Sequence, residues 1–263
     1  MKLRMFQVDA FTAERFRGNP AAVIPLQTWL SDELMQAIAA ENNLSETAFF
    51  VREADGAFYI RWFSPLTEID FCGHATLASA FVLLEAGLAR APLTFRAAAV
   101  GDLAVQRRAD GMLEISFPNR APEPVAEPPA ALLQGLGCEP EAVLRSSQAW
   151  FAVYRDEREV RALTPDLDAL RTLAPLDVAV TAAGSEQDFV SRYFWPANGG
   201  DEDPVTGSIH AGLAPYWAER LGRNELVALQ ASKRSGILHC RVEADRVMVA
   251  GQAVLYLDGT IEL

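Results

Sequence analysis

The spacing of apolar and polar residues divides the chain into short strands and a few helices. Alternation of side-chain type predicts a strand over residues 3–8, and three further strands are predicted over 21–24, 46–51 and 58–63. Ser31 has the features of an N-cap for a helix over 32–41, with Asp32 and Glu33 in its first turn. A second helix is predicted over 74–86, ended by Gly87 and followed by three short strands.

The same order of elements returns in the second half of the chain, which indicates an internal duplication. Two offsets align the halves: 134 places Gly73 on Gly207 and Arg107 on Arg241, and 131 places Phe63-Ser64-Pro65 on Phe194-Trp195-Pro196. Thr164 is predicted to cap the helix that follows it, and Ser208 to open a helix that reaches Leu221. Two unrelated halves built from common patterns are the alternative.

Strands mixed with helices, without regular βαβ alternation, favour an α+β fold. We expect two pseudo-symmetric lobes, each a mostly antiparallel sheet wrapped around one buried central helix. The proline-rich segment 119–129 interrupts regular structure and predicts a linker. The expected lobes are therefore 1–118 and 130–263.

Charge and composition narrow the classes of partner and cofactor. A net charge of −12 over 263 residues argues against nucleic acid or an anionic membrane as the main partner. No apolar run is long enough to span a bilayer, and the N-terminus is typical of a strand rather than a signal peptide, so a cytoplasmic protein is expected. The three cysteines and three histidines lack the spacing of a metal site, and no nucleotide or cofactor motif is present, so no metal and no cofactor are predicted.

Two segments in matching positions of the repeat stand at predicted helix N-termini. They run from Cys72 to Thr76 and from Asp203 to Ser208. Unsatisfied N–H groups and the helix dipole make such a terminus attractive to anions. If the halves face each other, both termini converge on one cleft that binds a carboxylate and stabilises a carbanion.

The residues resemble those of the phenazine-biosynthesis PhzF-like isomerases, relatives of diaminopimelate epimerase. The resemblance spans nearly the whole chain and rests on five segments: Asp9-Ala10-Phe11-Thr12, Gly18-Asn19-Pro20-Ala21-Ala22-Val23, Asn43-Leu44-Ser45-Glu46-Thr47, Cys72 to Thr76 and Asp203 to Ser208. It implies paired lobes of the diaminopimelate-epimerase type, a homodimer, and an active site between the lobes that needs no cofactor.

The resemblance assigns Glu46 as the group that moves the proton, a role for which a carboxyl buried in a closing cleft is suited. Taken alone, Glu46 is more typical of a polar bend before a strand, and the resemblance reverses that preference. His74 is expected to donate a proton or hydrogen bond to a developing enolate, and Asp203 to support it by holding an imidazole or a substrate amine. Their alternatives are a capping or packing histidine and a turn aspartate.

The substrate carboxylate is expected to bind Ser208 and the N–H groups around Gly73 and Gly207, with Asn19 as a further hydrogen-bonding amide. Ser208 also fits a simple N-cap, and Asn19 fits a turn residue before Pro20.

The chain departs from diaminopimelate epimerase, which uses two opposed thiols. Cys72 keeps one of these positions and Pro204 stands at the other, which argues against two-thiol epimerisation. One carboxylate suits isomerisation, in which a proton moves between positions of a small carboxylate-bearing molecule. The family's named substrate is trans-2,3-dihydro-3-hydroxyanthranilate, and another amino or hydroxy acid is equally consistent with the sequence. The competing hypotheses are an amino-acid racemase or epimerase with a second base, and a binding protein without turnover.

Overall fold

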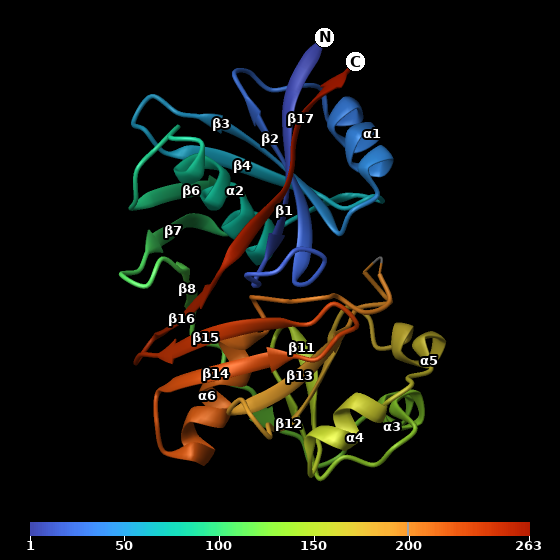
Figure 1. Cartoon of the computed structure of the whole chain (residues 1–263). Coiled ribbons are helices and arrows are strands. Elements are labelled where there is room, and N and C mark those ends of the chain that lie inside the picture. Colours follow the sequence, from blue (N-terminus) through green and yellow to red (C-terminus); the bar gives the residue numbers. More distant parts are fainter. Residues whose placement is uncertain (199) are drawn as a thin grey trace. The chain divides into compact units, whose positions relative to one another are not determined.

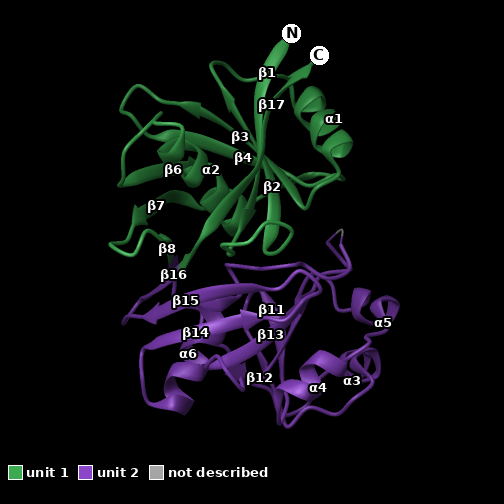
Figure 2. Ribbon diagram, in the orientation of Figure 1, with its two compact units in different colours: residues 1–116, 250–263 green, residues 117–249 purple. Residues whose placement is uncertain are grey.

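The computed structural model describes residues 1–198 and 200–263, which form two compact units (Figures 1 and 2). Unit 1 comprises residues 1–116 and 250–263, and unit 2 comprises residues 117–249. Both are sheet-dominated with few helices, so the α+β class is confirmed. No helix among the described residues is long and apolar enough to cross a membrane.

Unit 1 is a sheet with two helices. Its elements are β1 Lys2–Ala10, β2 Asn19–Leu26, α1 Asp32–Asn42, β3 Glu46–Arg52, β4 Phe58–Phe63, β5 Glu68–Ile69, α2 Gly73–Glu85, β6 Leu93–Ala97, β7 Gly101–Arg107, most of β8 Leu113–Pro118, and β17 Ala253–Glu262. The oxygen of Ser31 accepts a hydrogen bond from Leu34 N at 3.3 Å, which confirms the predicted cap of α1. Nearly every residue of α2 is buried, and it packs against β1, β2 and β3 as the expected central helix.

Unit 2 repeats this plan with three short helices beside its central one, and their buried residues pack against the strands over 177–183 and 189–194. Its elements are β9 Glu123–Pro124, α3 Ala130–Leu136, β10 Ala142–Arg145, β11 Ala149–Val153, α4 Glu157–Ala162, α5 Leu167–Arg171, β12 Asp177–Ala183, β13 Phe189–Phe194, α6 His210–Leu221, β14 Glu225–Gln230, β15 Gly236–Val242, and most of β16 Arg246–Gly251. The central helix is α6, which contacts β14 and β15.

The strand pairing confirms the repeat. In unit 1 the pairs β1–β2, β3–β4 and β6–β7 are antiparallel, and β2–β3 and β4–β6 are parallel. In unit 2 the pairs β10–β11, β12–β13 and β14–β15 are antiparallel, and β11–β12 and β13–β14 are parallel. The register matches as well, because Thr47 opposite Phe63 becomes Val178 opposite Phe194 at the offset of 131.

The unit boundaries differ from the lobes expected from the sequence. The C-terminal strand β17 belongs to unit 1, where it pairs antiparallel with β1 over nearly its whole length. The termini therefore lie side by side (Figure 1). The segment 119–129 is not a separate linker: it lies in unit 2, where Arg120 N–H donates to Ala211 O and Val125 N–H to Val143 O.

One predicted helix cap and one predicted helix start are wrong. Asp166 caps α5, with its carboxylate accepting from the N–H groups of Asp168 and Ala169, so Thr164 lies outside the helix. Helix α6 begins at His210, two residues after Ser208, and no side chain caps it. Ser208 instead lies in the turn before α6, and its hydroxyl is engaged elsewhere.

Candidate active site

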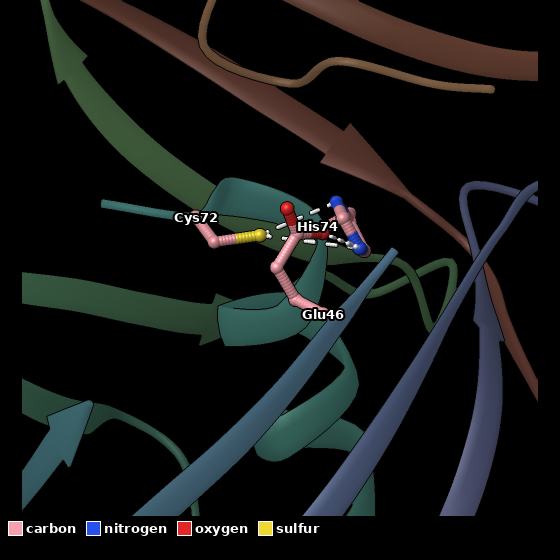
Figure 3. A group of neighbouring side chains, drawn as sticks. All are labelled: Glu46, Cys72 and His74. Carbon is pink, nitrogen blue, oxygen red and sulfur yellow. Dashed lines mark hydrogen bonds and ion pairs between the residues drawn. The ribbon is translucent and has the colours of Figure 1, made fainter. Parts of the chain in front are cut away.

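Glu46 and His74 meet inside unit 1. Glu46 is the first residue of β3, opposite Ala21 of β2, and His74 is the second residue of α2. Their side chains are 5% and 4% exposed, and Glu46 Oε2 lies 3.1 Å from His74 Nε2 (Figure 3). The contact is close but poorly aligned, because the buried Oε2 has no partner that meets hydrogen-bond geometry within the described chain.

Asn19 and Cys72 surround the other side of the imidazole. Asn19 Nδ2 lies 3.0 Å from His74 Nδ1, and Cys72 Sγ lies 3.3 Å from the same nitrogen. With the Asn19 amide as donor, Nδ1 is the acceptor and the proton of the neutral ring is on Nε2, which faces Glu46. Asn19 therefore contacts the imidazole as well as preceding Pro20.

The N-terminus of α2 adds an electropositive edge to this group. Cys72 is the N-cap residue and contributes no side-chain hydrogen bond to the helix. The first N–H groups of a helix, here beginning at Gly73, have no acceptor within it. They are suited to an anion, as the sequence predicts for Gly73.

The other predicted residues lie in unit 2, on the turn before α6. Asp203 is 8% exposed, and its carboxylate accepts a hydrogen bond from the hydroxyl of Thr206. Gln230, fully buried at the end of β14, fastens this turn: its Nε2 donates to Asp203 O at 2.8 Å and its Oε1 accepts from Thr206 N at 2.8 Å. Gly207 follows Thr206 in the same turn. Gln230 was missed from the sequence because it lies 24 residues beyond Thr206 with no motif around it.

Ser208 ends a chain of hydrogen bonds through unit 2. Gln148 Nε2 donates to Ser208 Oγ at 2.9 Å and to Tyr193 Oη at 3.2 Å. Tyr193 donates in turn to Asp177 Oδ2 at 2.6 Å, and Asn198 Nδ2 donates to Asp177 Oδ1 at 2.7 Å. Because Ser208 Oγ accepts from Gln148, its own proton is directed away from Gln148 and can be donated to a ligand.

Burial raises the pKa of Asp177, although its hydrogen bonds from Tyr193 and Asn198 act in the opposite direction. Burial, reinforced by the nearby Asp177 carboxylate, raises the pKa of Tyr193 well above its ordinary value. Tyr193 therefore keeps its proton and remains the donor to Asp177. Asp177 and Tyr193 therefore fix which group donates and which accepts in the series of hydrogen bonds that ends at Ser208.

The repeat places the two polar groups in equivalent positions. At the offset of 131 Glu46 corresponds to Asp177, and each faces an alanine of the preceding parallel strand, Ala21 and Ala149. At the offset of 134 His74 corresponds to Ser208. The duplicated positions have thus diverged into a carboxylate–imidazole pair in unit 1 and a hydroxyl supported by a hydrogen-bond chain in unit 2. Applying the offset of 131 to Glu46 would have identified Asp177 as its counterpart from the sequence alone.

His210 is structural rather than catalytic. Its Nδ1 donates to Thr206 O at 2.9 Å, and its fully buried Nε2 has no hydrogen-bond partner within the described chain. Thr76, its counterpart at the offset of 134, makes the same bond to the carbonyl four residues earlier, from Oγ1 to Cys72 O at 2.6 Å. Both residues fasten the first turn of their helix.

We expect His210 to make the fold less stable in acid. Burial lowers the pKa of His210 to about 4 from 6.5, so between these values the unfolded chain binds a proton that the folded chain does not. Stability therefore falls as the pH decreases through this window, by about 3 kcal/mol in total. Urea unfolding at pH 7 and pH 4.5 should show a smaller loss in His210→Gln than in the wild type. An equal loss in both proteins would contradict this role.

The chain is similar to known proteins over its entire length. The family described as phenazine biosynthesis-like protein (PhzC-PhzF) matches residues 8–259. A relative from Pseudomonas aeruginosa, named as an uncharacterized isomerase, is 49% identical, and the match covers 100% of both chains. The crystal structure of a PhzF-family phenazine biosynthesis protein from Enterococcus faecalis has a TM-score of 0.94 and 43% identity, covering 100% of both chains.

More distant structures share the fold alone. A hydroxyproline epimerase from Agrobacterium vitis, solved with bound trans-4-OH-L-proline, has a TM-score of 0.61 at 11% identity and covers 99% of this chain and 92% of its own. The epimerase-type fold expected from the sequence is thereby confirmed. The full-length matches show that the chain belongs to the phenazine biosynthesis-like (PhzC-PhzF) family.

Proposed function

We propose that this protein is an isomerase that moves a proton within a small carboxylate-bearing molecule, with Glu46 as the general acid and base. The observation that carries the proposal is the buried contact between Glu46 Oε2 and His74 Nε2. A carboxylate shielded from water, beside one imidazole proton and without an aligned partner, is prepared to accept a proton from a substrate. The names of the full-length relatives support the reaction class.

In the proposed reaction, Glu46 removes a proton from carbon and the electron pair of that C–H bond forms a new double bond as an enolate or dienolate. His74 Nε2–H stabilises the developing oxyanion, and the protonated Glu46 returns the proton to a second carbon on the same face of the molecule. Asp203 holds the substrate amine or an imidazole. All steps use side chains and backbone N–H groups, and the proposed reaction needs no cofactor.

The substrate carboxylate binds the N–H groups around Gly73 and Gly207 and the hydroxyl of Ser208 in this proposal. It requires the turns that precede α2 and α6 to reach one substrate molecule, the arrangement that the sequence repeat leads us to expect. Substrates of this kind include trans-2,3-dihydro-3-hydroxyanthranilate and other small amino or hydroxy acids.

We expect Gln148 to control substrate affinity through Ser208. In Gln148→Glu the new carboxylate accepts the Ser208 proton, so the hydroxyl can no longer donate it to the substrate. The loss of one hydrogen bond to a charged group should raise KM by about 10- to 100-fold while kcat changes little. Steady-state exchange kinetics measure both constants. Gln134→Glu adds the same charge at an exposed position of unit 2 and should leave KM unchanged.

The experiment that tests the function is a screen of small amino and hydroxy acids for proton exchange in deuterated water. Incorporation of deuterium into a substrate, together with relocation of its double bond, supports the isomerase. Inversion at an α-carbon without relocation of a double bond would favour the epimerase hypothesis. Binding without any exchange across the screen would favour a binding protein without turnover. The isomerase is preferred because Asp177, the counterpart of Glu46, is bound by Tyr193 and Asn198 and is not available as a second base.

We further propose that the protein acts in the cytoplasm as a homodimer. The buried thiol of Cys72, 3.3 Å from the imidazole of the proposed catalytic pair, is suited to a reducing compartment. Light scattering should give twice the mass of one chain, and cell fractionation should recover the protein with cytoplasmic enzymes. A monomeric mass, or recovery from another compartment, would contradict the corresponding part of this proposal.

A further inference from the structure

Glu46, Cys72 and His74 bring three different metal-binding atoms together inside unit 1. One carboxylate oxygen, one sulfur and one ring nitrogen all lie within 4.8 Å of one another, and the three side chains lie close together (Figure 3). We propose that these residues form a site for a zinc-like transition-metal ion, and that an ion bound there blocks proton transfer. The sequence predicts no metal site, because Glu46 lies 26 residues from Cys72 and only folding brings them together.

Two of the distances between the three ligand atoms are close to those around a tetrahedral ion. Zinc binds nitrogen and oxygen at about 2.0–2.1 Å and thiolate sulfur at about 2.3 Å, so tetrahedral geometry separates a nitrogen from an oxygen by about 3.3 Å and from a sulfur by about 3.6 Å. His74 Nε2 lies 3.1 Å from Glu46 Oε2 and 3.9 Å from Cys72 Sγ. Both distances are within about 0.3 Å of the tetrahedral values. Cys72 Sγ lies nearer to His74 Nδ1, at 3.3 Å, and within 4.8 Å of the Glu46 oxygen, so rotation of the Cys72 side chain toward Nε2 completes three ligand positions and leaves a fourth open.

The charge and burial of the three side chains also favour a bound divalent ion. Each of the three residues is buried, at 4–6% exposure, and Glu46 Oε2 has no hydrogen-bond partner of its own within the described chain. A divalent ion would neutralise the carboxylate and the thiolate, whose proton is released when the metal binds. The donor set of thiolate, imidazole and carboxylate is one that zinc prefers and that calcium and magnesium do not.

Asn19 can accept a hydrogen bond from His74 when His74 binds the ion. A histidine that binds metal through Nε2 carries its proton on Nδ1 and donates it to a neighbouring acceptor. The amide of Asn19 lies 3.0 Å from Nδ1, and rotation of the amide presents its oxygen in place of its nitrogen. The same residue therefore orients the ring for proton transfer with one end of its amide and for metal binding with the other.

Metal binding and the proposed reaction exclude each other, because both use Glu46 Oε2 and His74 Nε2. This consequence rests on the proposed function, whereas metal binding itself does not. Free zinc would inhibit exchange in the wild type, and chelation would restore it. A thiol at position 72 thus makes the site sensitive to metal ions.

Titration with Co²⁺ in place of Zn²⁺ tests the site without any substrate. We expect one Co²⁺ per chain, a thiolate-to-cobalt charge-transfer band, and the visible spectrum of a tetrahedral ion. Cys72→Ala should abolish the charge-transfer band and weaken binding by at least about 100-fold, and Glu46→Gln should weaken binding while keeping the band. Asn19→Ala should weaken binding by about 10- to 100-fold.

Cys138→Ala is the matched control, because it removes an exposed thiol and should leave the titration unchanged. Absence of a stoichiometric charge-transfer band in the wild type, its persistence in folded Cys72→Ala, or its loss in Cys138→Ala would overturn the proposal. Circular dichroism verifies folding of each variant. A wild type that binds Co²⁺ but exchanges no proton would reject the proposed function and leave the metal site standing.

Discussion

Glu46→Gln should lower proton exchange by about 10²- to 10⁴-fold, the usual contribution of a general acid–base group. The amide has nearly the shape of the carboxylate, so the contact with His74 and the start of β3 should persist, but it can neither accept nor return a proton at neutral pH. The loss should appear in kcat, because the proton moves only in the transition state, and substrate affinity should change little. Exchange is measured by NMR in deuterated water, and affinity by calorimetry.

A second buried glutamate of unit 1 provides the matched control. Glu114 lies in β8 at 7% exposure and outside the group formed by Glu46, Cys72, His74 and Asn19. Glu114→Gln makes the same chemical change and should retain exchange. If Glu46→Gln exchanges as fast as the wild type, Glu46 is not the proton carrier and the proposed mechanism is wrong.

Much of the fold could be predicted from local patterns. Strands β3 and β4, the capped helix α1 and the buried helix α2 all lie where periodicity and turn residues place them. The Phe-x-Pro segments end equivalent strands, β4 and β13, in equivalent registers. These features were predictable because each depends on residues close together in the sequence.

The missed features depend on contacts between distant residues. The pairing of β17 with β1 joins opposite ends of the chain, and no local signal distinguishes it from a strand of unit 2. Gln148 and Gln230 matter only because folding places their amides beside Ser208 and Thr206. The pairing of Glu46 with His74 inside unit 1 also arises from folding, because β3 and α2 are separated by two further strands in the sequence.

Replacement of Gly18, the residue before Asn19, should lower both the stability of the fold and the rate of proton exchange. Gly18 has φ +63°, and a Cβ there would lie 2.1 Å from Ala10 O and 2.7 Å from Thr12 Cγ2. The left-handed backbone costs a non-glycine residue about 1–2 kcal/mol, and relieving a clash with rigid backbone costs about 1–3 kcal/mol more. Gly18→Ala should therefore lower the free energy of unfolding by about 2–5 kcal/mol, measured by urea denaturation.

Gly56→Ala separates the two causes, because Gly56 has φ +94° and nothing lies within 4 Å of its added Cβ. It should show only the backbone penalty of about 1–2 kcal/mol. Gly18→Ala should also reduce exchange, since Ala10 pairs with Asn19 and a shift at this point moves the amide away from His74 Nδ1. Equal destabilisation by the two variants, with exchange intact in Gly18→Ala, would mean that the close packing at Gly18 neither strains β1 nor positions the imidazole.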